Sequence, residues 1–490
     1  KKIYFDGFLP QSKLETRLQR LRRLTADSLK YYHLNRLLHQ KSTTRETGVS
    51  LSECSPRKKF SPWLPPPFIV PLVLETLCQS KKYQYKTEVV PWEADAFCAG
   101  HVKKYGGLIL TADSDLLIYD LGLHGKVAFF RDMKESTGGS LNPARVYHPF
   151  MITRRLGLEI SNGLCSLAFE LIQSSRKRAS AANLATTLRA KNKFPDAYEN
   201  FMKEYTVKIP DFMSPIEVSE VELFLKLRSL DSRISEYILQ FPSFAKVAQL
   251  TLSVPNGDEK KRIFLPFILD SPVKTSGWDI SVSTRKLAYG LVNLAIPEME
   301  QNKTVLEHRR LTIGLGGKEL RLPVIVEISA ACINLCQTHL ELEKKLPYLC
   351  NHEIWIAWAI FQEIGWSRSK SKQSLTAMIL EEFSSYSSIQ SMFKSFEWEL
   401  LHLFAQIDAS LYSFRILHQI SGVVIAKGNR ESIPAGLLSL HHILGSLPAV
   451  RDFKDRDSIA NFLTKHLVQI SSVTSEILSV HASDTAQIIL

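Results

Sequence analysis

Five acidic residues in three separated clusters have the types and spacing that best fit a chemical role in this chain. Asp6 ends the run Ile-Tyr-Phe-Asp, Glu93 and Asp95 lie in Pro-Trp-Glu-Ala-Asp-Ala, and Asp113 and Asp115 lie in Thr-Ala-Asp-Ser-Asp. Carboxylates held close together raise one another's pKa unless a cation lies between them. Mg²⁺ prefers oxygen ligands, and two such ions about 4 Å apart stabilise both the attacking and the leaving oxygen of a phosphodiester. The pattern therefore predicts a divalent-metal site for phosphoryl chemistry on nucleic acid.

The elements around these clusters are expected to bring them together. Residues 2–5 and 107–110 are short apolar runs typical of buried strands, and each ends close to an acidic residue. The carboxyl ends of parallel strands are where α/β folds place their ligands. Glu93 would lie in the first turn of a helix, where the macrodipole favours an anion. Each cluster alone also fits a turn, a helix start or an N-cap, so the metal site is indicated only by the three together.

Strand-like and helix-like segments alternate from residue 67 onward, which predicts an α/β fold with a mostly parallel sheet and flanking helices. The expected segments are helices at 67–80 and 93–104, strands at 86–90, 107–112, 116–119 and 127–130, and helical spacing over 149–173. Residues 211–490 instead give long helical patterns, at 217–241, 324–345, 354–364, 398–418 and 433–447. This part of the chain is therefore predicted to be a largely α-helical accessory domain.

The three acidic clusters resemble the carboxylate blocks of XPG-like or flap endonucleases, whose catalytic domain has a PIN-like α/β fold. The similarity covers about residues 1–175, and Phe-Asp-Gly-Phe-Leu-Pro together with Pro-Trp-Glu-Ala-Asp-Ala most resembles the Asteroid branch. The resemblance implies that the five carboxylates bind two Mg²⁺ or Mn²⁺ ions. It also implies that Lys13 and Arg20 contact the scissile phosphate of 5′-flap or other branched DNA.

The chain departs from this family pattern in several places. It begins at Lys1 in what resembles the second strand, so the first strand and its metal-binding Asp are expected to be missing. Ser174 stands where the last metal-binding Asp would be, with Glu170 one helical turn earlier. A glycine-rich helix-two-turn-helix motif is not apparent. Two hypotheses therefore stay open: an active structure-specific endonuclease, and a catalytically inactive nuclease-fold scaffold or nucleic-acid-binding protein in repair or RNA regulation.

The net charge of +12 is concentrated at the N-terminus, where residues 1–60 hold 14 Lys or Arg against 5 Asp or Glu. A long helix predicted over 9–40 carries Lys13, Arg17, Arg20 and Arg23. A basic helix face beside a carboxylate cluster favours phosphate binding that weakens with salt, although a solvated helix face has the same pattern.

Two further basic clusters lie in segments without clear periodicity. Arg57, Lys58 and Lys59 stand in a predicted flexible, arch-like loop at 41–66, beside aromatic residues that either stack on bases or anchor a plain linker. Arg176, Lys177 and Arg178 begin a basic linker at 176–210. This second cluster is expected to contact duplex phosphates, to serve as a nuclear import signal, or to be a solvated linker.

Length and composition lead us to expect a nuclease domain at 1–175, the linker at 176–210 and the helical domain at 211–490. The expected partners are branched or junction DNA, with RNA as an alternative, and proteins that bind the helical region. No membrane association is expected, because the sequence lacks an uncharged apolar run of 18 residues.

Seven scattered cysteines favour reduced thiols and a nuclear or cytoplasmic protein, with the nucleus preferred for a DNA partner. Cys332, Cys336 and His339 share a helical face without an evident fourth ligand, so buried packing is expected there rather than a metal. A Ser-His-Asp hydrolase is not indicated, because the sequence has no Gly-x-Ser-x-Gly elbow.

Overall fold

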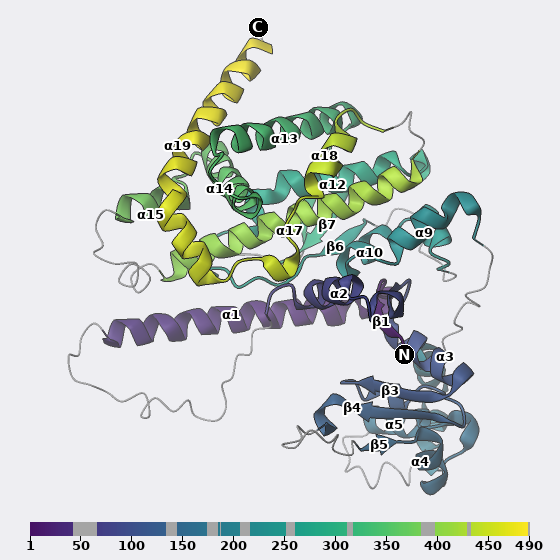
Figure 1. Cartoon of the computed structure of the whole chain (residues 1–490). Helices are drawn as coiled ribbons and strands as arrows, with labels where there is room; N and C mark the ends of the chain where they lie inside the picture. Colours follow the sequence, from purple (N-terminus) through teal and green to yellow (C-terminus); the bar gives the residue numbers. More distant parts are fainter. Residues whose placement is uncertain are drawn as a thin grey trace. The chain divides into compact units, whose positions relative to one another are not determined.

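The protein forms two compact units in a computed structural model (Figure 1). The structure describes residues 1–42, 66–133, 145–173, 185–186, 188–205, 216–250, 260–310, 317–383, 397–428 and 433–488. The first unit contains residues 1–9, 88–216 and 249–251, and the second contains 10–87, 217–248 and 252–490. Residues 10–87 thus group with the helical unit, whereas the sequence places them in one N-terminal domain over 1–175.

The first unit contains the α/β part of the chain. Its strands and helices are β1 (Ile3–Asp6), β2 (Thr87–Val90, with Thr87 assigned to the second unit), α3 (Ala94–Tyr105), β3 (Gly107–Thr111), β4 (Gly125–Phe129), β5 (Val146–Tyr147), α4 (Pro149–Arg155), α5 (Cys165–Gln173), α7 (Arg189–Lys193) and α8 (Pro195–Tyr205). β1 pairs with β2, and β3, β4 and β5 form a second small sheet in that order. β3 and β4 are parallel, with Ile109 opposite Val127, and β5 is antiparallel to β4.

Helix α3 packs against β1, β3 and β4 and so joins the two small sheets of the first unit. Its buried residues Phe97 and Val102 lie in one core with Val90 of β2, Ile109 of β3 and Val127 of β4. The alternation along β3 is clear, because Ile109 is buried whereas Leu108 and Leu110 are exposed. The α/β prediction is confirmed for this part of the chain, and α3 connects the elements that carry the acidic clusters.

One predicted strand is wrong. Residues 116–119 do not form a strand: a 3₁₀ turn covers Asp115–Leu117 and is followed by irregular chain. The Asp113 carboxylate accepts a hydrogen bond from the Asp115 N–H at 3.0 Å, and this local contact starts the turn. Short polar side chains that bind nearby backbone in this way compete with strand formation.

The second unit is largely helical, as the sequence predicts. Its helices are α1 (Leu14–Ser42), α2 (Ile69–Gln79), α9 (Val221–Leu227), α10 (Ser232–Ile238), α11 (Pro242–Val247), α12 (Val282–Leu294), α13 (Ile325–Lys345), α14 (Asn351–Ser369), α15 (Leu375–Phe383), α17 (Glu397–Lys427), α18 (Leu437–Leu444) and α19 (Arg456–Ile488). α17 is central and packs against α9, α12, α14 and α18 (Figure 1). The long helix predicted over 217–241 is instead broken into α9 and α10.

The second unit also contains a sheet that the helical patterns did not predict. β6 (Arg262–Phe264), β7 (Thr304–His308) and β8 (Lys318–Arg321) form it in that order, with β6 parallel and β8 antiparallel to β7. Each strand has only three to five residues. Such short runs carry little periodic signal, and this sheet depends on pairing between segments far apart in the sequence.

We expect Asp408→Asn to raise the free energy of unfolding of the second unit at pH 8 by about 1–3 kcal/mol. This range is reduced because the Asp408 side chain is partly exposed to solvent. Burial raises the pKa of Asp408 to about 7, and Arg456 opposes this shift. Because the folded pKa lies above the unfolded value, the aspartate costs increasing stability as pH rises from about 4 to 7. Urea unfolding at pH 4 and pH 8 measures the effect. A gain of equal size at both pH values would contradict the prediction.

Candidate metal and nucleic-acid site

Asp6 lies at the N-terminus of α3, although it belongs to another segment of the first unit. After β1 the chain runs beside the residues that precede α3: the Gly7 N–H donates to the Trp92 carbonyl oxygen at 3.1 Å, and Phe8 stacks on the Trp92 ring. Asp6 Oδ1 accepts a hydrogen bond from the Ala94 N–H at 2.7 Å. The carboxylate therefore satisfies one of the helix's unpaired amides, at the end where the macrodipole favours negative charge.

Glu93 and Asp95 occupy the first positions of the same helix. Glu93 is the N-cap residue of α3, and Asp95 lies in its first turn. One turn further on, burial first and then the charges of Asp95 and Asp6 raise the pKa of the Cys98 thiol to about 12. Asp6, at the end of β1, and Asp95, at the start of α3, thus both act on the thiol of Cys98, which stays neutral.

Asp113 and Asp115 are exposed in the turn that follows β3. The Asp113 N–H donates to Thr111 Oγ1 at 3.0 Å, and the Asp113 carboxylate accepts from the Asp115 N–H. Side-chain contacts of this kind fix a turn locally. They hold the two acidic side chains at the carboxyl end of β3, where the sequence predicts them.

Two tyrosines connect the acidic residues of α3 with those after β3. Burial first, and then the charges of Glu93, Asp95 and Asp115, raise the pKa of Tyr119. The Tyr205 hydroxyl donates to Asp115 Oδ2 at 3.4 Å, and its ring contacts Tyr119 with centroids 5.3 Å apart. Carboxylates from both segments therefore act electrostatically on the Tyr119 phenol. The sequence analysis missed both tyrosines, and the only available signal was the position of Tyr119 four residues after Asp115.

The donor chemistry of this cluster, formed by the carboxylates of Asp6, Glu93, Asp95, Asp113 and Asp115, fits a divalent cation. Carboxylate oxygens are the hard ligands that Mg²⁺ and Mn²⁺ prefer, and Mg²⁺ usually keeps several waters. Asp6, Asp113 and Asp115 are exposed and accessible to such waters. Within the described ranges, no three His, Cys, Asp or Glu side chains are arranged as a group that could hold an ion. The cluster therefore supplies ligands of suitable chemistry, but the described side chains do not form a preassembled ion site.

The predicted basic residues that the structure describes belong to the second unit. Lys13 ends a short 3₁₀ helix before α1, and Arg20 and Arg23 lie on α1; all three are exposed. Arg17 differs from the prediction of a phosphate-facing side chain. It is buried, forms an ion pair with Glu236, and places its guanidinium 3.8 Å from the centre of the Phe264 ring. Arg17 therefore holds α1 to the rest of its unit.

Glu170, which the sequence analysis places one turn before Ser174, has a local structural role. It is buried in α5 and accepts a hydrogen bond from the Ala190 N–H, an amide in the first turn of α7. A carboxylate in that position satisfies an otherwise unpaired helix amide. The remaining predicted residues lie outside the described ranges: Arg57, Lys58, Lys59, Ser174, Arg176, Lys177 and Arg178.

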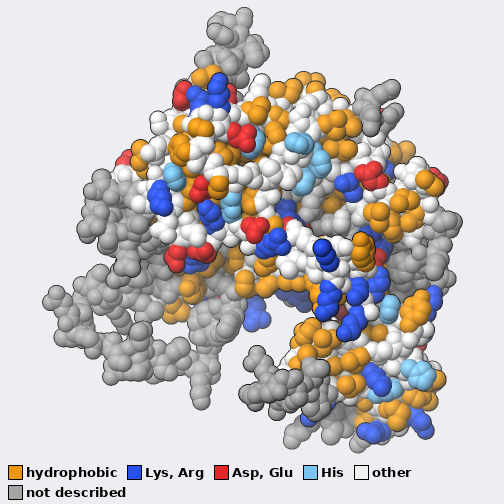
Figure 2. Space-filling view, viewed as in Figure 1, with side chains coloured by type: hydrophobic (Ala, Val, Ile, Leu, Met, Phe, Trp, Pro, Cys, Tyr) orange, Lys and Arg blue, Asp and Glu red, His pale blue; other side chains and the backbone are white. Residues whose placement is uncertain are grey.

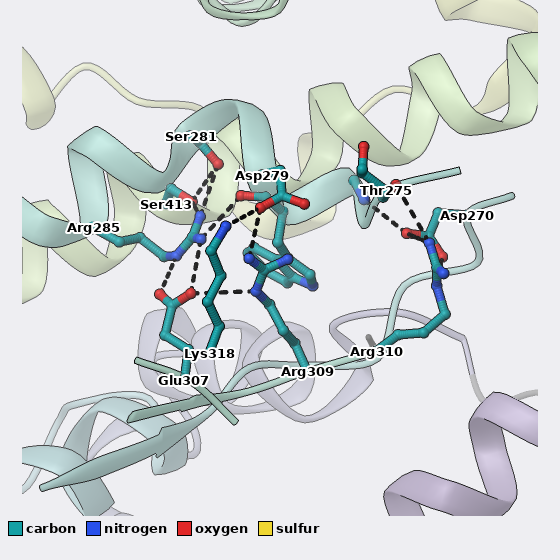
Figure 3. Close-up of polar contacts among 12 residues, drawn as sticks. Asp270, Thr275, Asp279, Ser281, Arg285, Glu307, Arg309, Arg310, Lys318 and Ser413 are labelled. Carbon is teal, nitrogen blue, oxygen red and sulfur yellow. Dashed lines mark hydrogen bonds and ion pairs between the residues drawn. The ribbon is translucent and has the colours of Figure 1, made fainter. Parts of the chain in front are cut away.

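A second polar cluster is buried in the second unit, around the end of β7 (Figure 3). Arg285 of α12 binds both oxygens of Glu307, at 2.6 and 3.1 Å, and the Tyr289 hydroxyl donates to the same carboxylate at 2.8 Å. Both ion-pair side chains are fully buried. Burial raises the pKa of Glu307, but Arg285 and the neighbouring donors outweigh it, so the pKa is lowered overall.

Two further ion pairs extend this buried cluster. Arg309 binds Asp279 at 2.7 Å, and Arg310 binds Asp270 through two nitrogens, at 2.6 and 2.7 Å (Figure 3). Arg310 also donates to carbonyl oxygens of the loop that follows Asp270, including that of Ser271 at 3.0 Å. These contacts connect the sheet to the segment before α12. The cluster therefore has the composition of a structural network, with each carboxylate paired to an arginine.

Cys332 and His339 are packed into the helical core, as the sequence analysis expects. His339 stacks on Trp355 and Trp358, with ring centroids 5.4 and 5.2 Å apart. Burial raises the pKa of Cys332 to about 12. These features are typical of core packing.

Comparison with known proteins gives one family match. A family model described as XPG domain containing matches residues 65–322, which is 258 of the 490 residues. The matched span contains four of the five acidic residues, and Asp6 precedes it. No curated protein and no solved structure matches the chain.

Among the described residues, every helix is too short or too polar to cross a membrane.

Proposed function

The chain belongs to the XPG domain-containing family, and from this premise we propose that it is a divalent-metal-dependent, structure-specific endonuclease of the Asteroid branch. Its proposed substrate is flap or branched DNA, which it would cut by phosphodiester hydrolysis. The observation that carries the proposal is the hydrogen bond between the Asp6 carboxylate and the Ala94 amide, which brings Asp6 to the start of α3, where Glu93 and Asp95 stand.

The proposed ligands of the metal are Asp6, Glu93, Asp95, Asp113 and Asp115. Bound Mg²⁺ or Mn²⁺ would activate water and stabilise negative charge on phosphate oxygens. The protein's own contribution is positioning: the start of α3 supports negative charge on Asp6, and the Tyr205 hydroxyl orients Asp115. The Tyr205 phenol is protonated at neutral pH, as tyrosine ordinarily is, so it can donate to Asp115.

Lys13 and Arg20 are proposed to stabilise the charge that develops on the phosphate, and Arg23 to contact the nucleic-acid backbone. All three are exposed, as such contacts require. Arg57, Lys58, Lys59, Arg176, Lys177 and Arg178 remain proposed contacts on the basis of sequence. We further propose a nuclear location and a role in DNA repair, with protein partners bound by the helical region.

The arginines of α1 allow a paired test of this assignment. Arg20→Ala is expected to weaken DNA binding several-fold at low salt and to reduce the slope of log affinity against log salt by about 1. Arg17→Ala is expected to lower the free energy of unfolding by about 1–3 kcal/mol, since it removes a buried charged hydrogen bond. Fluorescence anisotropy and urea unfolding measure the two effects. Unchanged DNA binding by Arg20→Ala would remove Arg20 from the proposed interface.

Cleavage of labelled DNA tests the proposed activity. The protein is incubated with a 5′-flap substrate and with a blunt duplex of the same sequence, in Mg²⁺, Mn²⁺ or EDTA. The proposal expects metal-dependent cleavage near the branch and little cleavage of the blunt duplex. Binding to the flap without cleavage in either metal would contradict the enzyme and favour the alternative, a nuclease-fold scaffold. Preferential binding of a matched RNA would redirect the substrate assignment.

A further inference from the structure

Strand β6 begins at an arginine whose main chain is held by a neighbouring side chain. The Arg262 N–H donates to Gln240 Oε1 at 2.9 Å, and the Gln240 side-chain amide donates to the Arg262 carbonyl oxygen at 2.7 Å. Gln240 lies just after α10, and its amide also donates to the Glu236 carbonyl oxygen at 3.0 Å. A side chain that pairs with both main-chain groups of an edge residue takes the place of a further strand. The backbone of Arg262 is therefore fixed at one edge of the sheet.

The side chain of Arg262 reaches the segment that leads into α1. Its Nη1 donates to Gln11 Oε1 at 3.4 Å, and Gln11 opens the short 3₁₀ helix that ends at Lys13. Because Gln11 is neutral, this contact positions the guanidinium without cancelling its charge. The two partners are 251 residues apart in the chain, so local sequence patterns did not select Arg262. The contact places a further arginine beside the basic residues of α1.

A second set of contacts joins α1 to the sheet. The Arg17 guanidinium lies 3.8 Å from the centre of the Phe264 ring, and the His308 imidazole stacks on the same ring, with centroids 4.4 Å apart. Burial first, and then the charges of Arg262 and Arg17, lower the pKa of His308 to about 4. The imidazole is thus neutral at pH 7, and both arginines act on it electrostatically. α1 and β6 therefore bring their positive charges into one region of the second unit.

The segments that meet in this region have an excess of positive charge. Residues 10–23 contain five Lys or Arg and one acidic residue, and residues 260–262 are all basic. Glu236 of α10, which packs against β6, pairs with both Arg17 and Arg233. Figure 2 shows Lys and Arg side chains gathered on the surface where Figure 1 places α2, β6 and α10. We call the exposed or partly exposed basic residues of α10 and β6, with the two before β6, the β6 basic surface: Arg233, Lys260, Lys261 and Arg262.

The spread of these charges favours an extended polyanion over a single small anion. Lys13 and Arg20 are seven residues apart, about 10 Å along a helix axis, and the β6 basic surface adds charges from other elements. Each strand of duplex DNA carries a phosphate about every 3.4 Å along its axis, and Arg and Lys are its usual partners. Lys260 pairs with Glu319 at 2.9 Å, and both are exposed, so a phosphate can replace that carboxylate at little cost.

We propose that the β6 basic surface binds the sugar-phosphate backbone of nucleic acid and continues the contacts proposed for Lys13 and Arg20. Arg262 makes its central contact, because Gln240 fixes its main chain and its guanidinium lies beside Gln11. The inference rests on the proposed function, since it extends the phosphate contacts assigned there to α1. It concerns the second unit alone and requires neither bound metal nor cleavage.

Binding of duplex DNA in EDTA tests the proposal with the full chain, because it is measured without cleavage. A short labelled blunt duplex is titrated with the natural chain, Arg262→Gln and Arg321→Gln, by fluorescence anisotropy at several salt concentrations. Arg262→Gln is expected to weaken binding several-fold at low salt and to reduce the slope of log affinity against log salt by about 1, equally for two unrelated sequences. Arg321→Gln changes an exposed arginine of β8, at the opposite edge of the same sheet, and should leave both quantities unchanged.

A variant that conserves the charge separates a phosphate contact from a structural role. Arg262→Lys should keep the salt slope of the natural chain, and a slope as low as that of Arg262→Gln would overturn the proposal. Equal binding by Arg262→Gln and Arg321→Gln would also overturn it, and if Arg20→Ala still weakened binding, the proposed function would stand.

The natural chain itself gives the remaining outcomes. Its failure to bind the duplex would overturn both this inference and the proposed function. A polyglutamate peptide bound more tightly than the duplex, with the same loss on Arg262→Gln, would mean that the β6 basic surface takes an acidic protein instead.

Discussion

Replacing Glu93 by Gln, or Asp115 by Asn, is expected to abolish metal-dependent cleavage of flap DNA, with a loss of at least about 1,000-fold in rate. Each change keeps the shape of the side chain and removes one negative charge from the proposed metal ligands. Because the proposed chemistry depends on charge that holds and positions a divalent ion, loss of one ligand should slow cleavage even when the ion is bound. Single-turnover cleavage at saturating Mg²⁺ measures the effect.

The control for these variants is Asp120→Asn in the same unit. Asp120 is an exposed carboxylate that pairs with Lys103 at 2.6 Å. Its replacement by Asn removes one negative charge but leaves the proposed ligands unchanged. Because an exposed ion pair contributes little to stability, the cleavage rate should stay within about two-fold of that of the natural protein. If Glu93→Gln and Asp115→Asn retained cleavage at the level of Asp120→Asn, the acidic cluster would not be the active site.

Arg285→Met is expected to destabilise the second unit by about 3–5 kcal/mol. The change leaves Glu307 fully buried without the guanidinium that binds both of its oxygens. It also removes the contacts of Arg285 with Ser413 on the central helix α17 and with the Trp278 carbonyl oxygen. Urea unfolding followed by tryptophan fluorescence measures the loss, because five tryptophans that the structure describes, at 278, 355, 358, 366 and 398, belong to this unit.

Two controls separate the buried charge from other effects of the Arg285 substitution. Lys260→Met breaks the exposed pair with Glu319 and should cost at most about 1 kcal/mol. Adding Glu307→Leu to Arg285→Met should recover part of the stability, since the double variant no longer buries a carboxylate left with only the Tyr289 hydroxyl and Arg309, whose Nε is 3.4 Å away. A loss for Arg285→Met no larger than that for Lys260→Met would show that the buried pair does not organise the unit.

Local sequence patterns predicted much of the fold. Apolar runs next to the acidic residues gave β1, β2 and β3, and helical periodicity gave α2, α3, α13, α14 and α17. The strand predicted at 116–119 was wrong because the contact between Asp113 and the Asp115 amide outweighs the apolar run after it. The sheet of β6, β7 and β8 was missed because strands of three to five residues become stable only through partners distant in sequence.

The same limits apply to the site. Residue types and order were sufficient to select the five carboxylates, because acidic residues after strands and at helix starts have recognisable local positions. Tyr205 was missed because it reaches Asp115 from 90 residues further along the chain. Arg17 looked like the other arginines of its helix, and its partner Glu236 lies 219 residues away. Burial of a charged residue by a distant partner has no local signal.

Manganese binding tests the central claim most directly, because it reports on the acidic cluster whether or not the protein cuts DNA. Electron paramagnetic resonance of free Mn²⁺ is recorded while the ion is titrated with the natural chain, Glu93→Gln, Asp115→Asn and Asp120→Asn. The account predicts saturable binding by the natural chain and by Asp120→Asn, and binding at least about ten-fold weaker for the other two variants. Equal binding by all four proteins, or none by the natural chain, would contradict it.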